Sequence, residues 1–289
     1  MLFPKQVEII EVSPRDGLQN ESVLVPTEEK KKMILHLQKM GVKRIEATSF
    51  VNSEIVPQMA DAQEIIEFCH EIGIESIVLT PNLRALNRAI ENKVSQIAVF
   101  VGASETFNMR NIKRSIDDSL AECTKIFQKA KDHTIFIRAY VSMSFNCPFE
   151  GPVSFEKICY IVDHFVAHGA DEIVIGDTNG QANPRIVYER FQALKKRHPD
   201  KVFVAHFHDT NGFAYANTIA ALQVGIDKFD SSLAGLGGCP FSPGATGNIS
   251  TEGIVKLLEE MQIETGIDIA AMNKAVIFTK EMIAKLEGR

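Results

Sequence analysis

The chain has 289 residues, of which 45% are hydrophobic and 24% charged, and its formal net charge at pH 7 is −6. These proportions are typical of a globular domain and exclude a disordered chain. The negative charge argues against a nucleic-acid-binding protein, which needs a basic surface to displace counterions. No apolar run approaches the roughly 18 residues that cross a bilayer, so we expect no membrane partner.

The amino terminus and the cysteines both indicate a cytoplasmic protein. The first residues, MLFPKQVEII, lack the basic and apolar regions of a signal peptide. The 5 cysteines are odd in number and form no C-x-x-C pair, so we expect free thiols in a reducing compartment. Cys69, Cys123 and Cys159 lie in helix-like segments, where a buried small side chain is the ordinary interpretation.

Strand and helix patterns alternate along the whole chain. The strands are expected at residues 7–13, 44–49, 75–80, 96–103, 134–143, 171–177, 201–208 and 228–234. The helices include residues 28–41, 60–73, 115–131, 154–169, 184–198 and 215–225, and 251–264 and 269–286 close the chain. Cap residues precede several of them: Thr27, Ser115, Ser154 and Asn183.

Four of the helix-to-strand steps share one pattern, an amphipathic run, a glycine and a short polar step into an apolar strand. The glycines are Gly41, Gly73, Gly169 and Gly225. Each suits the position just after a helix, where φ is positive. Strict alternation through eight units predicts an α/β fold, a (β/α)8 TIM barrel with additional C-terminal helices. An open doubly wound sheet is the alternative, but no G-x-G-x-x-G follows the first strand.

We expect one catalytic domain over residues 1–289, with the barrel at about 7–265 and a helical tail at about 266–289. In such a barrel the reactive side chains lie at the C-terminal ends of the strands and in the following loops. Polar residues gather at these positions after strands 1, 2, 6, 7 and 8. They are SPRDGLQN (13–20), Glu46, GDTN (176–179), HFHDT (206–210) and GLGGCPFSPGATGN (235–248).

His206 and His208 are the first candidates for a metal site. At i and i+2 of a strand their imidazoles project from the same face and can clamp one ion. Hydrogen-bonded histidines of a polar barrel mouth are the alternative, but Asp16 on the nearby first strand adds a carboxylate. With an amide oxygen from Asn248, this set favours Mg²⁺ or Mn²⁺ over structural zinc.

Arg15 is the natural partner of an anion beside that metal. Its planar guanidinium suits a carboxylate, a thioester carbonyl or an enolate. A salt bridge to Glu46 or Asp177 is compatible with that role. We expect these two acids to orient the site, with Asp177 also a candidate proton shuttle, and neutralising Arg15 is the alternative for both.

Cys239 lies in a glycine-rich loop that is free to take unusual backbone angles. A thiol on such a loop, beside cations, can donate and accept protons near neutral pH. A phosphate cradle with an incidental cysteine is the alternative. Cys147 is the rival thiol, but its neighbours are not glycines and we expect a structural role.

A basic stretch after strand 4 carries Arg110, Lys113 and Arg114. It suits the phosphates of a large ligand, and a solvated basic loop is an equally good interpretation.

The quoted stretches, together with EVSPRDGLQNE, IEATSFV and VPQMAD, resemble the 3-hydroxy-3-methylglutaryl-CoA lyase family. That family belongs to the metal-dependent lyase and synthase barrels that share an Arg-Asp-Gly motif. The likeness runs from the first strand to the final helices. The cysteine loop is its most specific part, because the H-x-H and Arg-Asp-Gly motifs mark only the wider superfamily.

The resemblance implies a divalent-metal-dependent carbon–carbon lyase that cleaves 3-hydroxy-3-methylglutaryl-CoA to acetyl-CoA and acetoacetate, and a homodimer. It implies a metal site of Asp16, His206, His208 and Asn248. It implies that Arg15 stabilises the enolate and that Cys239 is the catalytic thiol of the mobile loop. It also implies catalytic roles for Asp16, His206, Glu46 and Asp177. We expect Gln19, Asn20 and Thr178 to contact the acyl-CoA substrate with Arg15.

Two positions depart from the family pattern. Phe241-Ser242 stands where Tyr-Ala is usual, and Ser22 where Lys is common; both bear on acyl-chain preference and CoA affinity. The main alternative function is a Claisen-condensing acyl-CoA synthase of the isopropylmalate or homocitrate kind, which commonly reads R-D-G-E-Q and carries a C-terminal extension. An oxo-acid aldolase and a barrel that binds ligand without turnover are the remaining alternatives.

Overall fold

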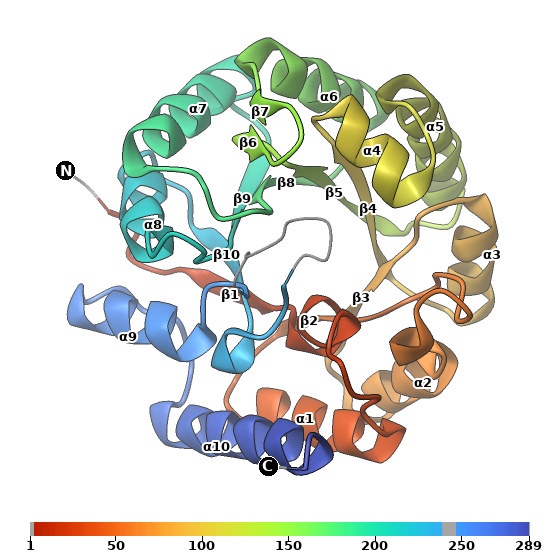
Figure 1. Cartoon of the computed structure of the whole chain (residues 1–289), viewed down its shortest axis with the longest axis vertical. Helices are drawn as coiled ribbons and strands as arrows, with labels where there is room; N and C mark the ends of the chain where they lie inside the picture. The colour runs from red at the N-terminus through yellow and green to blue at the C-terminus, as the bar shows by residue number, and fades with distance from the viewer. Residues whose placement is uncertain (1–2, 239–246, 289) are drawn as a thin grey trace.

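The strands that the alternating pattern predicts form one closed barrel in the computed structural model, which describes residues 3–238 and 247–288 (Figure 1). They are β1 (Glu8–Glu11), β2 (Arg44–Ser49), β3 (Glu75–Leu79), β4 (Gln96–Gly102), β5 (Phe136–Ser142), β8 (Glu172–Asp177), β9 (Val202–Phe207) and β10 (Lys228–Ser231). All pair in parallel, in the order β1-β10-β9-β8-β5-β4-β3-β2. The prediction of a TIM barrel is confirmed. A separate hairpin pairs β6 (Asn146–Cys147) with β7 (Gly151–Pro152).

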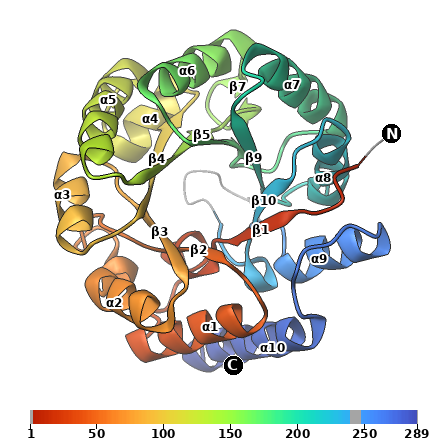
Figure 2. The same ribbon diagram turned by 180° about the vertical axis from the view of Figure 1, so that it is seen from behind.

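Helices surround the barrel (Figure 1). They are α1 (Thr27–Lys39), α2 (Ala62–Ile72), α3 (Leu83–Glu91), α4 (Glu105–Ile112), α5 (Ile116–Asp132), α6 (Phe155–His168), α7 (Pro184–Arg197), α8 (Ala214–Gln223), α9 (Thr251–Glu260) and α10 (Ile269–Leu286). Helix α10 lies beside α1 on the outside of the barrel (Figures 1 and 2). Within the described residues, no helix combines the length and the apolar character needed to traverse a bilayer. The boundary of the helical tail near residue 265 stays a prediction.

Most of the predicted helix ends are confirmed. The side chains of Ser115, Ser154 and Asn183 each accept a hydrogen bond from a backbone N–H in the first turn of α5, α6 and α7. The prediction for Thr27 was wrong: it is the first residue of α1, and Pro26 precedes it without a side-chain bond. The glycines at 41, 73, 169 and 225 all have positive φ, between 71° and 94°.

The basic stretch after β4 is only partly a loop, because Arg110 lies in helix α4 (Glu105–Ile112), while Lys113 and Arg114 follow it. Ser104 begins this helix, because its hydroxyl accepts the N–H of Phe107 at 3.2 Å. The amide of Asn108 then accepts the N–H of Gly102 at 2.8 Å, which ties the helix to the end of β4.

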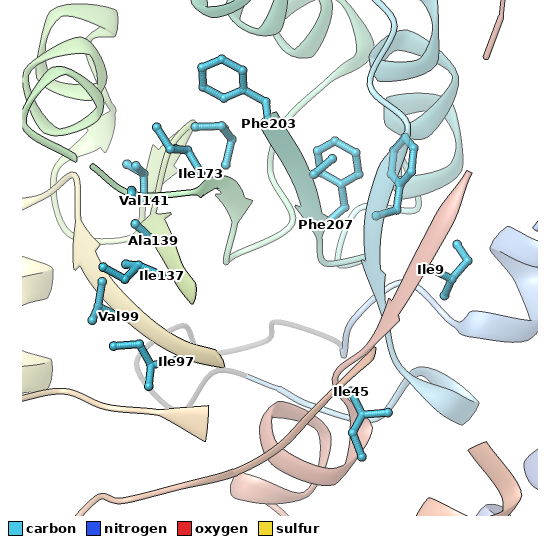
Figure 3. Close-up of a cluster of buried hydrophobic side chains, with 14 of the residues drawn as sticks. Ile9, Ile45, Ile97, Val99, Ile137, Ala139, Val141, Ile173, Phe203 and Phe207 are labelled. Carbon is cyan, nitrogen blue, oxygen red and sulfur yellow. The ribbon is translucent and has the colours of Figure 1, made fainter. Parts of the chain in front are cut away.

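Side chains alternate along each strand between the helix layer and the barrel interior. Outward-facing residues such as Ile97, Val99, Ile137 and Phe203 pack against the helices, and Figure 3 shows them on the outer faces of the strands. The inward-facing residues form a second, smaller cluster of Ile10, Ile77, Leu79, Ala98, Tyr140, Val174 and Val204. Because the period is two, the next inward position on β9 after Val204 is His206, at the C-terminal end of the strand.

The N-terminal end of the barrel interior is closed by charged side chains. Arg44 donates to both oxygens of Glu172, at 2.9 and 3.1 Å, and to Glu8 at 2.7 Å. Lys228 also donates to Glu172, at 2.8 Å. These paired charges fill the end of the interior that lies opposite the predicted site.

A second buried acid, Glu11 at the end of β1, joins the strand to later parts of the chain. Its Oε1 accepts the N–H groups of Ser13 and Leu233, both at 3.0 Å, and its Oε2 accepts the hydroxyl of Thr251 at 2.6 Å. Burial raises the pKa of Glu11 from its ordinary 4.5 to about 7, although these hydrogen bonds act in the opposite direction.

Glu11→Gln should therefore change how stability depends on pH. The pKa of Glu11 is higher in the folded protein than in the unfolded chain, so as pH rises the unfolded chain loses this proton first. The contribution of Glu11 to the free energy of unfolding of the wild type is therefore fully present below pH 4.5 and is lost as the pH rises through 7. The amide oxygen can accept the same two backbone N–H groups, the amide NH2 can donate to Thr251 Oγ1 in place of the bond that Glu11 accepts, and the side chain carries no charge. We expect the free energy of unfolding of the variant, relative to wild type, to gain about 3 kcal/mol between pH 4.5 and 8 in urea denaturation.

The exposed Glu91 provides the control, since Glu91→Gln removes the same charge from a solvated position. A difference between Glu11→Gln and wild type that stays constant from pH 4.5 to 8 would contradict the raised pKa.

Candidate metal centre and substrate cavity

Asp16, His206 and His208 converge at the mouth of the barrel. Asp16 belongs to a short helical turn, η1 (Ser13–Gly17), that follows β1, while His206 ends β9 and His208 follows it. Potential ligand atoms of the three side chains all lie within 4.8 Å of one another. The Nε2 atoms of the two histidines are 3.2 Å apart, and both imidazoles are buried.

Asn248 completes this cluster from the chain segment after β10. Its backbone pairs with that of His208 in an isolated antiparallel bridge. Its Nδ2 donates to Asp16 Oδ2 at 2.8 Å and to the carbonyl of Leu236 at 3.0 Å. Its Oδ1 is buried and, within the described part of the chain, has no hydrogen-bond partner. A buried oxygen without a donor is free to bind a cation.

These four side chains fit a divalent cation. They offer carboxylate and amide oxygens and two imidazole nitrogens, a set that suits Mg²⁺ or Mn²⁺. Two adjacent ligands at about 2.1 Å from one ion lie ~3 Å apart, close to the spacing of the histidine nitrogens. The residues that the sequence predicted as metal ligands are therefore brought together by the fold.

The charge state of Asp16 also suits a cation. Burial opposes ionisation of its carboxyl, but the positive charges of Arg15, His206 and His208 and the hydrogen bond from Asn248 outweigh that effect. They hold the pKa of Asp16 well below its usual range. Asp16 is thus a carboxylate at every physiological pH.

Arg15 is buried between two carboxylates. Its Nε donates to Glu46 Oε1 in a short contact, and its Nη1 donates to Asp16 Oδ1 at 2.8 Å. Burial acts to lower the pKa of Arg15, but the charges of Glu46 and Asp16 raise it above its usual value. The predicted salt bridge to Glu46 is confirmed.

Asp177, the other predicted partner of Arg15, makes different contacts. Its carboxylate accepts the N–H groups of Gln181 and Ala182, both at 3.0 Å, in the loop that leads to α7. Burial raises the pKa of Asp177 to about 6, against the effect of these bonds. Its backbone carbonyl accepts the N–H of His208 at 3.3 Å, so Asp177 supports the strand ends rather than Arg15.

Two buried residues of the site were missing from the sequence predictions. Asp230 on β10 lies behind His206, with its Oδ2 3.0 Å from His206 Nδ1. The hydroxyl of Tyr140 on β5 lies 2.6 Å from Glu46 Oε2 and 3.0 Å from Asp230 Oδ2. The available signal was a charged or polar residue at an inward position of an apolar strand, the same signal that pointed to Glu46.

A cavity of about 680 Å³ opens above this cluster. The predicted residues that line it are Arg15, Asp16, Gln19, Asn20, Thr178, His206 and His208. Glu46, Asp177 and Asn248 are not among the described residues that line it. Cys239 lies outside the described residues, while its neighbour Gly238 lines the cavity and accepts a hydrogen bond from Asn20 Nδ2 at 2.7 Å.

The cavity extends away from the metal cluster toward α4. Apolar side chains also line it, among them Val51, Ile55, Val56, Phe100 and Phe107. Three basic residues at α4 and the turn after it, Arg110, Lys113 and Arg114, belong to the same lining. One cavity thus combines a candidate cation site, apolar side chains and three positive charges.

The other thiols lie apart from this cavity. Cys69 and Cys123 are buried, and burial raises the pKa of each to about 12, as expected for structural cysteines. Cys147 is buried with its Sγ 3.0 Å from the hydroxyl of Ser104 at the start of α4, and Cys159 is half-buried. The expected structural role of Cys147 agrees with these contacts.

The fold and the site define a closed α/β barrel with two histidines, a carboxylate and an amide clustered at its mouth. The HMGL-like family model matches residues 6–277, and the chain belongs to this family. The hydroxymethylglutaryl-CoA lyase YngG of Bacillus subtilis is 41% identical over 99% of this chain and 96% of that protein. The mitochondrial hydroxymethylglutaryl-CoA lyase of Arabidopsis thaliana is 40% identical over 99% of this chain, which spans 61% of that protein.

Solved structures agree with this assignment. The HMG-CoA lyase of Bacillus subtilis superposes with a TM-score of 0.94 at 40% identity, over 98% of this chain and 96% of that one. An HMG-CoA lyase from Acinetobacter baumannii, solved in complex with coenzyme A and 3-methylmalate, gives 0.92 at 36% identity, over 98% and 93%. The resemblance that the sequence motifs indicate is therefore confirmed.

Gly237 lets the chain pass close to the cluster, and its substitution should disturb the site. Its φ is +103°, and a Cβ there would lie 2.6 Å from Asn248 Nδ2 and 3.0 Å from the carbonyl oxygen of Asp16. We expect Gly237→Ala to lower the free energy of unfolding by about 1–3 kcal/mol from backbone strain, and by more from the clash with Asn248. Thermal and urea denaturation measure the loss.

Gly212→Ala is the matched control, because Gly212 also has positive φ, at +71°, but a Cβ there meets nothing within 4 Å. Equal losses in the two variants would show that the approach to Asn248 does not matter.

Proposed function

We propose that this protein cleaves 3-hydroxy-3-methylglutaryl-CoA to acetyl-CoA and acetoacetate in a retro-Claisen reaction that depends on a divalent cation, Mg²⁺ or Mn²⁺. The observation that carries the proposal is the cluster of Asp16, His206 and His208 beside Arg15 in one cavity, with the buried amide of Asn248 hydrogen-bonded to Asp16. Membership of the HMGL-like family supports the reaction class.

The reaction breaks the bond between C2 and C3 of the substrate, and each product needs help from a different group. The electron pair of that bond stays on C2, which becomes the enolate of acetyl-CoA, while C3 becomes the ketone of acetoacetate. Asp16, His206, His208 and Asn248 would hold a divalent cation, which would supply Lewis-acid polarisation of the substrate. The Arg15 guanidinium, held by Glu46, faces the same cavity and stabilises the enolate oxygen.

Two proton movements complete the balance. The C3 hydroxyl loses a proton, and we assign its removal to the Asp16 carboxylate, which lines the cavity; His206, the other candidate, would use its free lone pair for the cation. C2 of the enolate gains a proton, which we assign to the thiol of Cys239. Glu46 and Asp177 act as positioning residues, because they hold Arg15 and the strand ends without lining the cavity.

The test is acetoacetate release from 3-hydroxy-3-methylglutaryl-CoA by the purified protein, after chelation and after readdition of Mg²⁺ or Mn²⁺. We expect activity only with the cation. His208→Ala removes one imidazole ligand and should weaken Mn²⁺ binding by more than ~100-fold in a titration followed by electron paramagnetic resonance.

The exposed His133 serves as the control, and His133→Ala should bind Mn²⁺ like wild type. An unchanged Mn²⁺ titration of His208→Ala would move the metal site elsewhere.

Cys239→Ala should separate proton delivery from metal binding. We expect a loss of at least ~100-fold in kcat, since a positioned acid contributes about that much, with Mn²⁺ affinity unchanged. Cys147→Ala is the matched control, and we expect it to keep its kcat. A Cys239→Ala enzyme with nearly wild-type kcat would remove the acid role from this thiol.

We further propose that the basic end of the cavity binds the phosphates of the CoA moiety. None of Arg110, Lys113 and Arg114 forms an ion pair with an acidic side chain in the described part of the chain. The apolar side chains that line the same cavity suit the pantetheine arm, which is long and weakly polar. The acyl end would contact Gln19, Asn20 and Thr178, which line the cavity. The Oε1 atom of Gln19 is buried and has no hydrogen-bond partner among the described residues.

Lys113→Gln/Arg114→Gln should therefore raise KM for the CoA thioester by at least ~10-fold and leave kcat unchanged, because each charged contact contributes about 1.5–3 kcal/mol. With the N-acetylcysteamine thioester of the same acid, which lacks phosphates, kcat/KM should equal that of wild type. Lys125→Gln/Lys131→Gln, at exposed positions of α5, makes the same change in net charge. Equal losses with both thioesters would contradict this placement of the phosphates.

We also propose a cytoplasmic homodimer, as is expected for the family. Sedimentation equilibrium of the full chain measures the oligomeric state.

A further inference from the structure

We propose that Asp230 is a positioning residue that sets the tautomer of His206 and thereby strengthens the binding of the divalent cation. This inference rests on the metal centre of the proposed function. It concerns the edge of the His206 ring that faces away from that centre.

The two ring nitrogens of His206 have different surroundings. Nδ1 lies 3.0 Å from Asp230 Oδ2, and Nε2 lies 3.2 Å from His208 Nε2 in the cluster with Asp16. A carboxylate accepts hydrogen bonds and donates none, so Nδ1 carries the proton of this bond. The neutral ring then has its lone pair on Nε2. Asp230 therefore presents His206 in the form that binds a metal.

Asp230 is itself held in place from across the barrel. It is 1% exposed, and the fully buried Arg138 on β5 forms an ion pair with its Oδ1. Strands β8 and β9 separate β5 from β10 in the barrel order, so this ion pair spans the interior. The carboxylate has one oxygen fixed by Arg138 and directs the other to His206.

The same carboxylate connects His206 to the anion-binding side of the site. The Tyr140 hydroxyl lies between Asp230 Oδ2 and Glu46 Oε2, and the other oxygen of Glu46 accepts from Arg15. The hydroxyl has one proton, which the shorter contact directs to Glu46, and this series of buried polar contacts joins the ligand His206 to Arg15. Displacing Asp230 would release one end of this series.

A matched pair of variants tests the role of Asp230. Asp230→Asn alone would leave the buried Arg138 without its counter-charge and endanger folding. We therefore compare Arg138→Lys with Arg138→Lys/Asp230→Asn. A lysine keeps the counter-charge of Asp230 in the single variant and is able to lose its proton in the double variant, and Glu172 keeps its bonds to Arg44 and Lys228 in both. The measurement is the Kd for Mn²⁺ by electron paramagnetic resonance.

We expect the single variant to bind Mn²⁺ within about threefold of wild type and the double variant to bind it 10- to 100-fold more weakly. Equal Kd values in the two variants would overturn the role of Asp230. If the wild type itself does not bind Mn²⁺, the proposed metal centre is wrong. That outcome is distinct from an unchanged Kd in the double variant, which concerns Asp230 alone.

Imidazole ¹⁵N spectra of the Mg²⁺-saturated wild type test the tautomer without any variant. We expect His206 to carry its proton on Nδ1. A proton on Nε2 of His206 would overturn the inference, whatever the fate of the variants.

Discussion

Arg15 brings a full positive charge into the barrel mouth with a side chain that is 9% exposed, and Glu46 and Asp16 lie against it. Removing a guanidinium from water carries a free-energy cost that only paired and hydrogen-bonded carboxylates offset. The two acids are consequently fixed in position. Asp16 in turn accepts from Asn248, and Glu46 accepts from Tyr140, so the candidate metal ligands and the buried hydrogen bonds behind them are built outward from this one cation.

Side chains alternate between the two faces of each strand, and this alternation directs the charged side chains into the barrel interior, where they can pair with one another. Outward positions are apolar and pack on the helices, which leaves the inward positions to form a narrow interior. That interior is apolar at its middle and charged at both ends. At one end Arg44 and Glu172 close the barrel, and at the other Arg138 and Asp230 lie beneath the mouth. Arg44 and Arg138 are each matched by a carboxylate from a different strand.

Function in this barrel depends on combining that rigid cluster with a long cavity. Residues of the candidate cation site, apolar side chains and the basic residues at α4 all line one cavity. The proposed function assigns bond cleavage to the groups at the strand ends and the phosphates of the substrate to the basic residues at α4. Remote binding of this kind contributes to the orientation of the reacting atoms.

The sequence by itself determined the strand and helix alternation, the barrel, and the set of candidate ligands Asp16, His206, His208 and Asn248, because each follows from local periodicity and from the rule that strand ends carry the site. Tertiary structure alone decided that Glu46 holds Arg15 while Asp177 holds the loop before α7. It also decided that α4 forms and that Asp230 lies behind His206. The contacts of Glu46 with Arg15 and of Asp230 with His206 join elements far apart in the chain, on which no local pattern reports.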